Sequence, residues 1–548
     1  MIEFIARKRI AAGALGLSAL AAAVAATAIA APARTDIAPY LEVQQVVTAD
    51  LNDGGDTLTY STVAAGVDGR VSTRRVEAAI SYRYERRIDW GNDVVDEDVH
   101  SGVAQARLEV APGVSLDAGG LAARARADGR GPAFGFSTAD DRNIAEVYSV
   151  YAGPTVSKKF GDIDVGASYR LAYVNVDDHS LAGVPTTPGQ AVRGRYDSST
   201  SHSASASVGM APGRLPFGWT VGGGYVREDV ERLDQNYEGK YIRADIVVPV
   251  SPTFAVTGGV GYEDIRIDQD DLLRDVNGVP LLTPGGRLIG DPSRPRLVAF
   301  DEDGLIWDVG FIYRPSRRTE LQARAGRRYG DMTYTGSLRH EFNSAYGVQA
   351  FVYDGISSFG RLVVTDLQGL PLDFKSNRNP LSTGIGGMGG CVFGTEGGQG
   401  VCFDDAFQSI DSNQFRHRGA TLLFSGARGP WSFGFGGGYA HRKYLAPEFG
   451  GGIFTMDGRA DESFTLNGNL SRQLSRSSGL SFDAYASWFD SGVPLSDTSF
   501  GAGASASYYQ SLFYDRLTGF AAIGLYTTDS GQFDSTSASA LVGLRYTF

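Results

Sequence analysis

Few side chains of this sequence have the types and spacing that catalysis or metal binding needs. The chain has six scattered histidines, with neither an HExxH motif nor a Ser-His-Asp spacing: His100, His179, His202, His340, His417 and His441. His100 lies near Asp96 and Asp98, a set that could serve a hydrolase, but ordinary polar histidines are the better interpretation. The acidic residues between Asp268 and Asp275 do not form an EF-hand motif, because the opening aspartate of such a loop is absent. We expect these carboxylates to be solvated. We predict no catalytic residue, cofactor site or resident metal, and no enzymatic activity.

Cys391 and Cys402 are the only cysteines, and both lie in a long glycine-rich stretch. If the chain is exported, as its N-terminus predicts, a disulfide between them is the default. Two free thiols are the alternative, and a metal site is disfavoured because no Cys or His partners surround them at ligand spacing. A disulfide closing a loop of this length would contribute roughly 2 to 3 kcal/mol in the chain-entropy model.

Residues 1–30 have the order of a secretory signal peptide. A basic start at Arg7, Lys8 and Arg9 is followed by an apolar, alanine-rich run to about Ala26, and residues 28–30 offer a small-residue cleavage site. A membrane anchor is the alternative, since the apolar run is long for a signal, but the cleavage motif favours removal. No later stretch has the roughly 18 apolar residues of a transmembrane helix.

The composition is that of an acidic, glycine-rich chain with few charges. Glycine accounts for 72 of 548 residues, charged residues for 20%, and the formal net charge is −12. This balance argues against a nucleic-acid-binding protein, which needs a basic face. No Pro/Ser-rich linker or charge block divides residues 31–548, so we predict one domain over this range.

The C-terminus predicts a strand with one apolar and one polar face, since apolar residues occupy every second position from Ala540 to Phe548. A terminal phenylalanine on such a strand resembles the sorting signal that the assembly machinery reads on bacterial outer-membrane β-barrels. We assign this role to Val542, Leu544, Tyr546 and Phe548. The same alternation recurs over 76–88, 163–173 and 431–442. The apolar faces of such strands point at each other in a soluble sandwich and at lipid in a transmembrane barrel.

The lengths of the connections favour the transmembrane barrel. Short turns, such as 111–113 and 251–253, alternate with long polar segments, above all 267–304 and 358–414. Outer-membrane barrels alternate in this way because their short turns face the periplasm and their long loops face outside. We predict an all-β, transmembrane antiparallel barrel of about 22 strands, with both termini at the short-turn end.

The lumen of so large a barrel would be open or filled by a plug. The first predicted strand, around residues 40–49, follows the signal directly, so we expect no plug domain and disfavour TonB-dependent uptake. Two loop sequences, 275–281 and 366–372, share the pattern D-x-(N/Q)-G-x-P-L, which predicts a small hairpin in each. The disulfide would stiffen the loop 358–414 as a lid folded into or over the mouth.

Charged residues of both signs lie between the apolar positions of the predicted strands and should face the lumen. Opposite charges on neighbouring strands can pair and stiffen the wall. The residues assigned to this lining are Arg83, Arg87, Arg107, Arg170, Arg243, Arg324, Arg328, Glu77, Glu85, Asp164, Asp245 and Glu320. Such a lining predicts a wet, weakly ion-selective interior.

Two stretches carry distinctive motifs. One runs from Val309 to Arg361, with GRRYG at 326–330 and TYTGSLRH at 333–340. The other has ARGPWSFGFG at 427–436, continued by YAHRKY at 439–444. Both resemble a family of outer-membrane β-barrel proteins found beside PEP-CTERM/exosortase and exopolysaccharide systems. The resemblance offers no catalytic residues, and it implies association with surface polysaccharide or sorted surface proteins.

These features predict an integral protein of the Gram-negative outer membrane, exported through a cleaved signal peptide. We expect a passive porin-like conduit, or an export or docking component for surface or secreted material such as exopolysaccharide. The alternatives are a structural or adhesive barrel with a loop-filled lumen and, third, a hydrolase with its site at the barrel rim. Expected partners are outer-membrane lipid and lipopolysaccharide, the barrel assembly machinery, and exopolysaccharide or its export components, but no nucleic acid.

Overall fold

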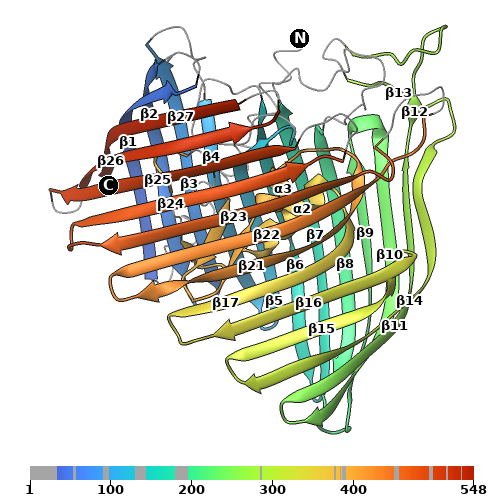
Figure 1. Ribbon diagram of the computed structural model, residues 1–548. Coiled ribbons are helices and arrows are strands. Elements are labelled where there is room, and N and C mark those ends of the chain that lie inside the picture. The colour runs from blue at the N-terminus through green and yellow to red at the C-terminus, as the bar shows by residue number, and fades with distance from the viewer. Residues whose placement is uncertain are drawn as a thin grey trace.

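Strands with alternating side chains form one sheet that closes on itself, and the computed structural model shows this ring with helices inside it (Figure 1). The structure describes residues 34–52, 57–90, 98–129, 143–178, 196–283, 287–375, 378–382, 384, 390–449, 456–492, 498–513, 516–531 and 534–548. The predicted signal peptide, residues 1–30, lies outside these ranges and stays a prediction.

Within the described ranges, 22 strands form the wall, each antiparallel to the next. They are β1 (Arg34–Asp50), β2 (Thr57–Ser72), β3 (Val76–Asp89), β4 (Asp98–Ala111), β5 (Val114–Arg126), β6 (Ile144–Phe160), β7 (Ile163–Asp178), β8 (Ser198–Met210), β9 (Gly218–Val230), β10 (Gln235–Ser251), β11 (Phe254–Gln269), β14 (Leu297–Ser316), β15 (Thr319–Arg328), β16 (Asp331–Glu341), β17 (Tyr346–Ser357), β21 (Gln414–Arg428), β22 (Trp431–Leu445), β23 (Ala460–Gln473), β24 (Ser478–Asp490), β25 (Ser499–Leu512), β26 (Leu517–Asp529) and β27 (Asp534–Thr547).

Smaller elements lie in the connections. A hairpin is formed by β12 (Asp271–Leu272) and β13 (Gly290–Asp291), and a small sheet by β18 (Phe374–Lys375), β19 (Cys391–Gly394) and β20 (Gly400–Cys402). In the described ranges the helices are η3 (Arg232–Asp234), α2 (Phe359–Gly369) and α3 (Asp404–Phe407). None of the helices in the described ranges has the length and hydropathy of a membrane span.

The ring closes between its first and last strands. Residues 40–50 of β1 pair antiparallel with residues 537–547 of β27. On the lumen side, Arg545 of β27 reaches Glu42 of β1, with 2.7 Å between Nε and Oε2. Closure leaves no unpaired strand edge, which the hydrocarbon of a bilayer would not tolerate.

The two faces of the wall differ in polarity. On β27 the side chains of Val542, Leu544 and Tyr546 are exposed on the outer face, while Ser537 and Ser539 are buried on the lumen face. Such a large apolar surface, unprotected in water, is the surface that lipid covers around a membrane barrel. The predicted all-β fold, an antiparallel barrel of about 22 strands, is confirmed as a closed ring of 22 strands within the described ranges.

The two ends of the barrel carry different connections, as the sequence predicts. Tight turns join the strands at one end, and Gly113 and Gly161 adopt φ values of 75° and 61° in two of them. The long segments 270–296 and 358–413 leave the other end. Because β1 starts and β27 finishes at the tight-turn end, this end faces the periplasm and the long segments face outside.

Only one of the two repeated loop patterns folds as predicted. In residues 275–281 the N–H of Gly278 donates to the carbonyl of Asp275 at 3.0 Å, and Gly278 has a φ of 83°. The N–H of Val279 donates to the Asp275 carboxylate, which lowers the pKa of that group. The second hairpin prediction is wrong, because residues 366–369 finish the helix α2, whose apolar side is buried.

A charge on the outer face of a strand should destabilise the barrel. Ile523 is 64% exposed at the middle of β26. We expect Ile523→Arg to lower the free energy of unfolding in phospholipid bilayers by about 2–4 kcal/mol, because a bilayer midplane disfavours arginine. Urea titration of the variant refolded into vesicles measures this.

Val276→Arg is the matched control, since Val276 is 101% exposed in the external hairpin. That substitution should leave the urea midpoint unchanged. Equal midpoints for the two variants would contradict a lipid-covered outer face.

Candidate functional site

Residues 358–413, called the lumen segment here, leave the wall at the outer end of β17 and return to it at β21. The described part of this segment holds α2, the β18–β19–β20 sheet and α3. Helix α2 contacts β5, β6, β7 and β8, and α3 contacts β5 on this side and β22 and β23 across the ring. These two groups of strands lie on opposite sides of the ring, so the segment lies inside the barrel, where Figure 1 shows both helices.

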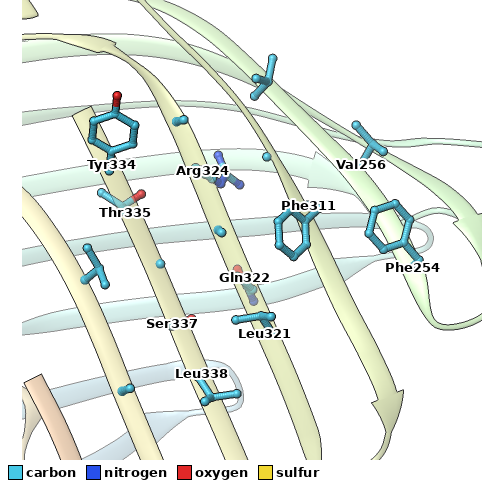
Figure 2. Close-up of a pocket in the computed structure, with 17 residues that line it drawn as sticks. Phe254, Val256, Phe311, Leu321, Gln322, Arg324, Tyr334, Thr335, Ser337 and Leu338 are labelled. Atoms are coloured by element: carbon cyan, nitrogen blue, oxygen red, sulfur yellow. The ribbon is translucent and has the colours of Figure 1, made fainter. Parts of the chain in front are cut away.

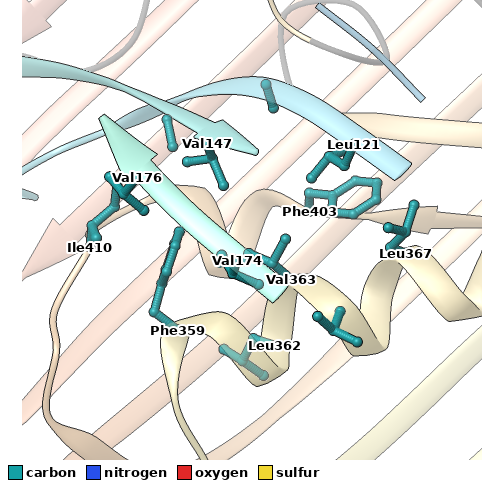
Figure 3. Packing of buried hydrophobic residues seen from close by; sticks show 14 of the residues in the cluster. Leu121, Val147, Val174, Val176, Phe359, Leu362, Val363, Leu367, Phe403 and Ile410 are labelled. Carbon is teal, nitrogen blue, oxygen red and sulfur yellow. The ribbon is translucent and has the colours of Figure 1, made fainter. Parts of the chain in front are cut away.

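Helix α2 has an N-cap and one apolar face. Ser358 Oγ accepts a hydrogen bond from the N–H of Arg361 at 3.1 Å, which satisfies one donor of the first turn. Apolar residues then follow at helical spacing: Phe359, Leu362, Val363 and Leu367. Figure 3 shows these side chains packed against buried side chains of the wall: Leu121, Val147, Val174 and Val176. The lumen segment is thus held by an apolar core within the barrel.

One acidic side chain of the wall binds the start of the lumen segment and the wall residue that follows the segment. Glu228 on β9 is 0% exposed. Ser358 Oγ donates to its Oε1 at 2.8 Å, Arg361 Nε lies 3.1 Å from its Oε2, and Gln414 Nε2 donates to Oε2 at 3.2 Å. The guanidinium of Arg361 also donates to Gln414 Oε1 at 2.7 Å and lies 3.6 Å from the ring centroid of Tyr237. We call Glu228, Ser358, Arg361 and Gln414 the latch.

The predicted disulfide between Cys391 and Cys402 is present, and it joins β19 to β20. Both cysteines are buried in a small apolar cluster with Phe393. The hairpin lies against two glycines of β22: a Cβ atom at Gly436 would lie 2.6 Å from Cys391 Sγ, and one at Gly434 would lie 2.5 Å from the Phe393 ring. The glycines therefore make the room that the lumen segment occupies.

The predicted lumen charges form ion pairs, some within one wall strand and others between wall strands that are adjacent or two to three places apart. Arg243 Nη2 lies 2.7 Å from Asp245 and Arg243 Nη1 2.6 Å from Asp308, and Arg324 Nη1 lies 2.9 Å from Asp245. The remaining pairs are Arg83 with Glu42 and Glu85, Arg87 with Glu85, Arg107 and Arg170 with Asp117, Arg328 with Glu263, Glu320 with Arg314, and Asp164 with Lys159. Glu77 stands opposite Arg107 in the register of β3 and β4.

Sequence reasoning did not find the latch. In the sequence, Glu228 is one of many acidic residues on alternating strands. Arg361 and Gln414 lie in the stretch that the sequence predicts to be a long outer loop. The one local signal was Ser358, a capping residue ahead of an apolar run with helical spacing. The hydrolase hypothesis finds no support at His100, because Asp98 bonds Tyr84 and Arg86 instead.

Comparisons with known proteins were made at the level of sequence and of structure. No protein-family model matches the chain, and no curated protein matches it in sequence. Among solved structures it is similar to the FrpB iron transporter of Neisseria meningitidis, with 9% identity over 93% of this chain and 82% of the other and a TM-score of 0.44. It is also similar to the ferric-catecholate import receptor Fiu of E. coli K12, with 11% identity over 93% and 81% and a TM-score of 0.46.

A third similar structure is the siderophore receptor PirA of Acinetobacter baumannii, with 9% identity, 93% and 80% coverage and a TM-score of 0.43. These proteins are described as an iron transporter, an import receptor and a siderophore receptor. The predicted passive conduit, export or docking component is wrong, because a folded segment lies inside the ring and packs against wall strands on opposite sides of it. The resemblance to exopolysaccharide-associated barrels stays a prediction.

A side chain added at Gly436 should displace the disulfide hairpin from β22. In Gly436→Ala the new methyl group would meet both sulfur atoms, at 2.6 and 2.7 Å. Overpacking of this kind costs about 1–3 kcal/mol, so we expect the disulfide to be reduced faster by a membrane-impermeant thiol. Mass spectrometry after alkylation measures the rate.

Gly304→Ala on β14 is the control, because nothing lies within 4 Å of a Cβ atom built there. Its disulfide should be reduced at the wild-type rate. If Gly436→Ala also keeps the wild-type rate, the hairpin does not rest on β22.

Proposed function

We propose that this chain is a gated importer of the outer membrane, in which the lumen segment closes the barrel until a ligand from outside releases it. The segment takes the place of a plug, and we propose no separate plug domain ahead of β1. The cargo is polar or charged, because Arg, Asp and Glu side chains line the inner half of the wall.

The position of the latch carries this proposal. Glu228 lies near the outer end of β9, Ser358 follows the outer end of β17, and Gln414 begins β21 at the same level. A ligand arriving from outside meets this end of the barrel first, whereas a cargo for export would arrive at the inner end. A gate latched at its outer side therefore suits uptake.

The way in which the segment is held also suits a gate. Much of the attachment is apolar, but the start of the segment is also held by one buried ion pair between Glu228 and Arg361. A buried pair is strong while intact and costly to break on one side only. A ligand that competes for either partner would release the start of the segment from the wall.

The remaining sequence predictions fit an importer and are part of the proposal. They are a signal peptide at 1–30, recognition of Val542, Leu544, Tyr546 and Phe548 by the assembly machinery, and contact of the outer rim with lipopolysaccharide. The side chains of Val542, Leu544 and Tyr546 are exposed on the outer face of β27, where lipid would contact them.

Loss of the latch charge should open the barrel. In Glu228→Gln the hydrogen-bonding shape remains, but Arg361 keeps a buried charge without its counter-ion, a change that typically costs about 3–5 kcal/mol. We expect the wild-type protein to stay closed in planar bilayers and the variant to open in discrete current steps.

Glu302→Gln removes an exposed carboxylate at the outer part of β14 and should behave like the wild type. A wild-type protein that conducts steadily, or a Glu228→Gln variant as closed as the wild type, would contradict a latched gate.

Import itself is tested in cells that lack the chain and are complemented with the wild type. Mass spectrometry of a defined medium would record which polar solutes are depleted. We expect at least one solute to disappear faster with the wild type than with an empty vector. Equal depletion of every solute would overturn the importer proposal.

A further inference from the structure

The importer leaves one feature of the outer face unexplained. A hollow of about 750 Å³ lies over β14, β15, β16 and β17 and reaches β11 (Figure 2). Its floor is made of small side chains, at Ala323 and Ala325 of β15 and Gly336 of β16. We call this hollow the trough.

Bulky apolar residues form the edges of the trough. Phe254 and Phe311 stack with 5.9 Å between ring centroids at one edge, and Figure 2 shows them side by side. Tyr334, Leu338 and Val352 border it on the other strands. The lining is hydrocarbon almost throughout, because the polar side chains of these strands alternate to the lumen face.

The strand register explains the shape. Phe311 stands opposite Ala323, Ala323 opposite Gly336, and Gly336 opposite Val352. At this row, Ala323 of β15 and Gly336 of β16 thus lie between the larger Phe311 and Val352. Leu321 and Leu338, one pair along, and Tyr334 on the other side border the trough along the strands. With strands about 4.8 Å apart, Phe311 and Val352 stand about 14 Å from each other. A short apolar trough of this kind fits part of an acyl chain that lies along the barrel.

Positive charge lies at the periplasmic end of the trough. The turn between β14 and β15 presents Arg317 and Arg318, both exposed. Leu321 and Leu338, paired across β15 and β16, lie close to this turn. Guanidinium groups bind phosphate oxygens with paired hydrogen bonds, and anionic lipids attract clustered basic residues.

We propose that the trough binds the acyl chains of an anionic phospholipid from the periplasmic leaflet, with the lipid phosphate on Arg317 and Arg318. The site is independent of the gate. It lies on the outer face of β11 and β14 to β17, whereas α2 packs on the lumen face of β5 to β8. Close packing of the chains against the floor would hold this lipid longer than lipids on the smooth remainder of the wall.

A second copy of the chain is a poorer occupant. A two-fold interface would place trough against trough and leave a void between them, whereas a symmetric interface needs a self-complementary surface. A flexible acyl chain fills a concave apolar surface without that requirement.

Native mass spectrometry of the full chain tests the site. Purified protein would be released from detergent after incubation with equal amounts of phosphatidylglycerol and phosphatidylethanolamine. We expect the wild type to retain phosphatidylglycerol preferentially. Ala323→Leu with Ala325→Leu fills the trough and should lower retention of both lipids by about tenfold.

Arg317→Gln with Arg318→Gln should keep lipid but lose the preference for the anionic headgroup. Ala521→Leu is the control, because Ala521 is an exposed alanine on the outer face of β26, distant from the trough. Equal retention by the filled variant and the control, or a dimer of the chain in place of bound lipid, would overturn the proposal. Folding of each variant is checked by its shift on unheated gels.

Discussion

The demand that every backbone hydrogen bond be satisfied inside lipid governs this structure. A β-sheet meets that demand only by closing on itself, and here β1 and β27 make the closing pairs. Closing 22 strands into a ring encloses more space than wall side chains can fill. The chain fills part of that space with residues 358–413, so the lumen segment follows from the size of the barrel.

The two faces of the barrel wall have different environments, lipid outside and the lumen inside, and different interactions stabilise each face. Lipid covers the outer face, and the lumen face combines ion pairs such as Arg243 with Asp308 with an apolar patch that receives α2. Hydrophobic burial contributes much of the lumen segment's attachment, while the buried pair of Glu228 and Arg361 holds its start to the wall. An attachment of this kind is stable as a whole but can be undone at one place, as a gate requires.

The sequence was informative where structure is local and uninformative where it is not. Period-two alternation and tight turns predicted the strands and their even number. They also predicted that both termini lie at the short-turn end of the barrel. The disulfide followed from two cysteines in an exported chain. The latch could not be predicted, because Glu228 and Ser358 lie 130 residues apart and only the closed ring brings them together. For the same reason the pattern at 366–372 predicted a hairpin, whereas burial against the wall makes a helix there. The predicted lid is present, but the sequence did not show how deeply it packs inside the ring, so a passive conduit gated by this loop was predicted instead.

Electron cryomicroscopy of the protein in lipid nanodiscs tests the central claim most directly. The account predicts density for α2 inside the ring, packed against β5 to β8, with its first turn beside Glu228. An empty lumen, with residues 358–413 lying beyond the outer rim, would contradict it.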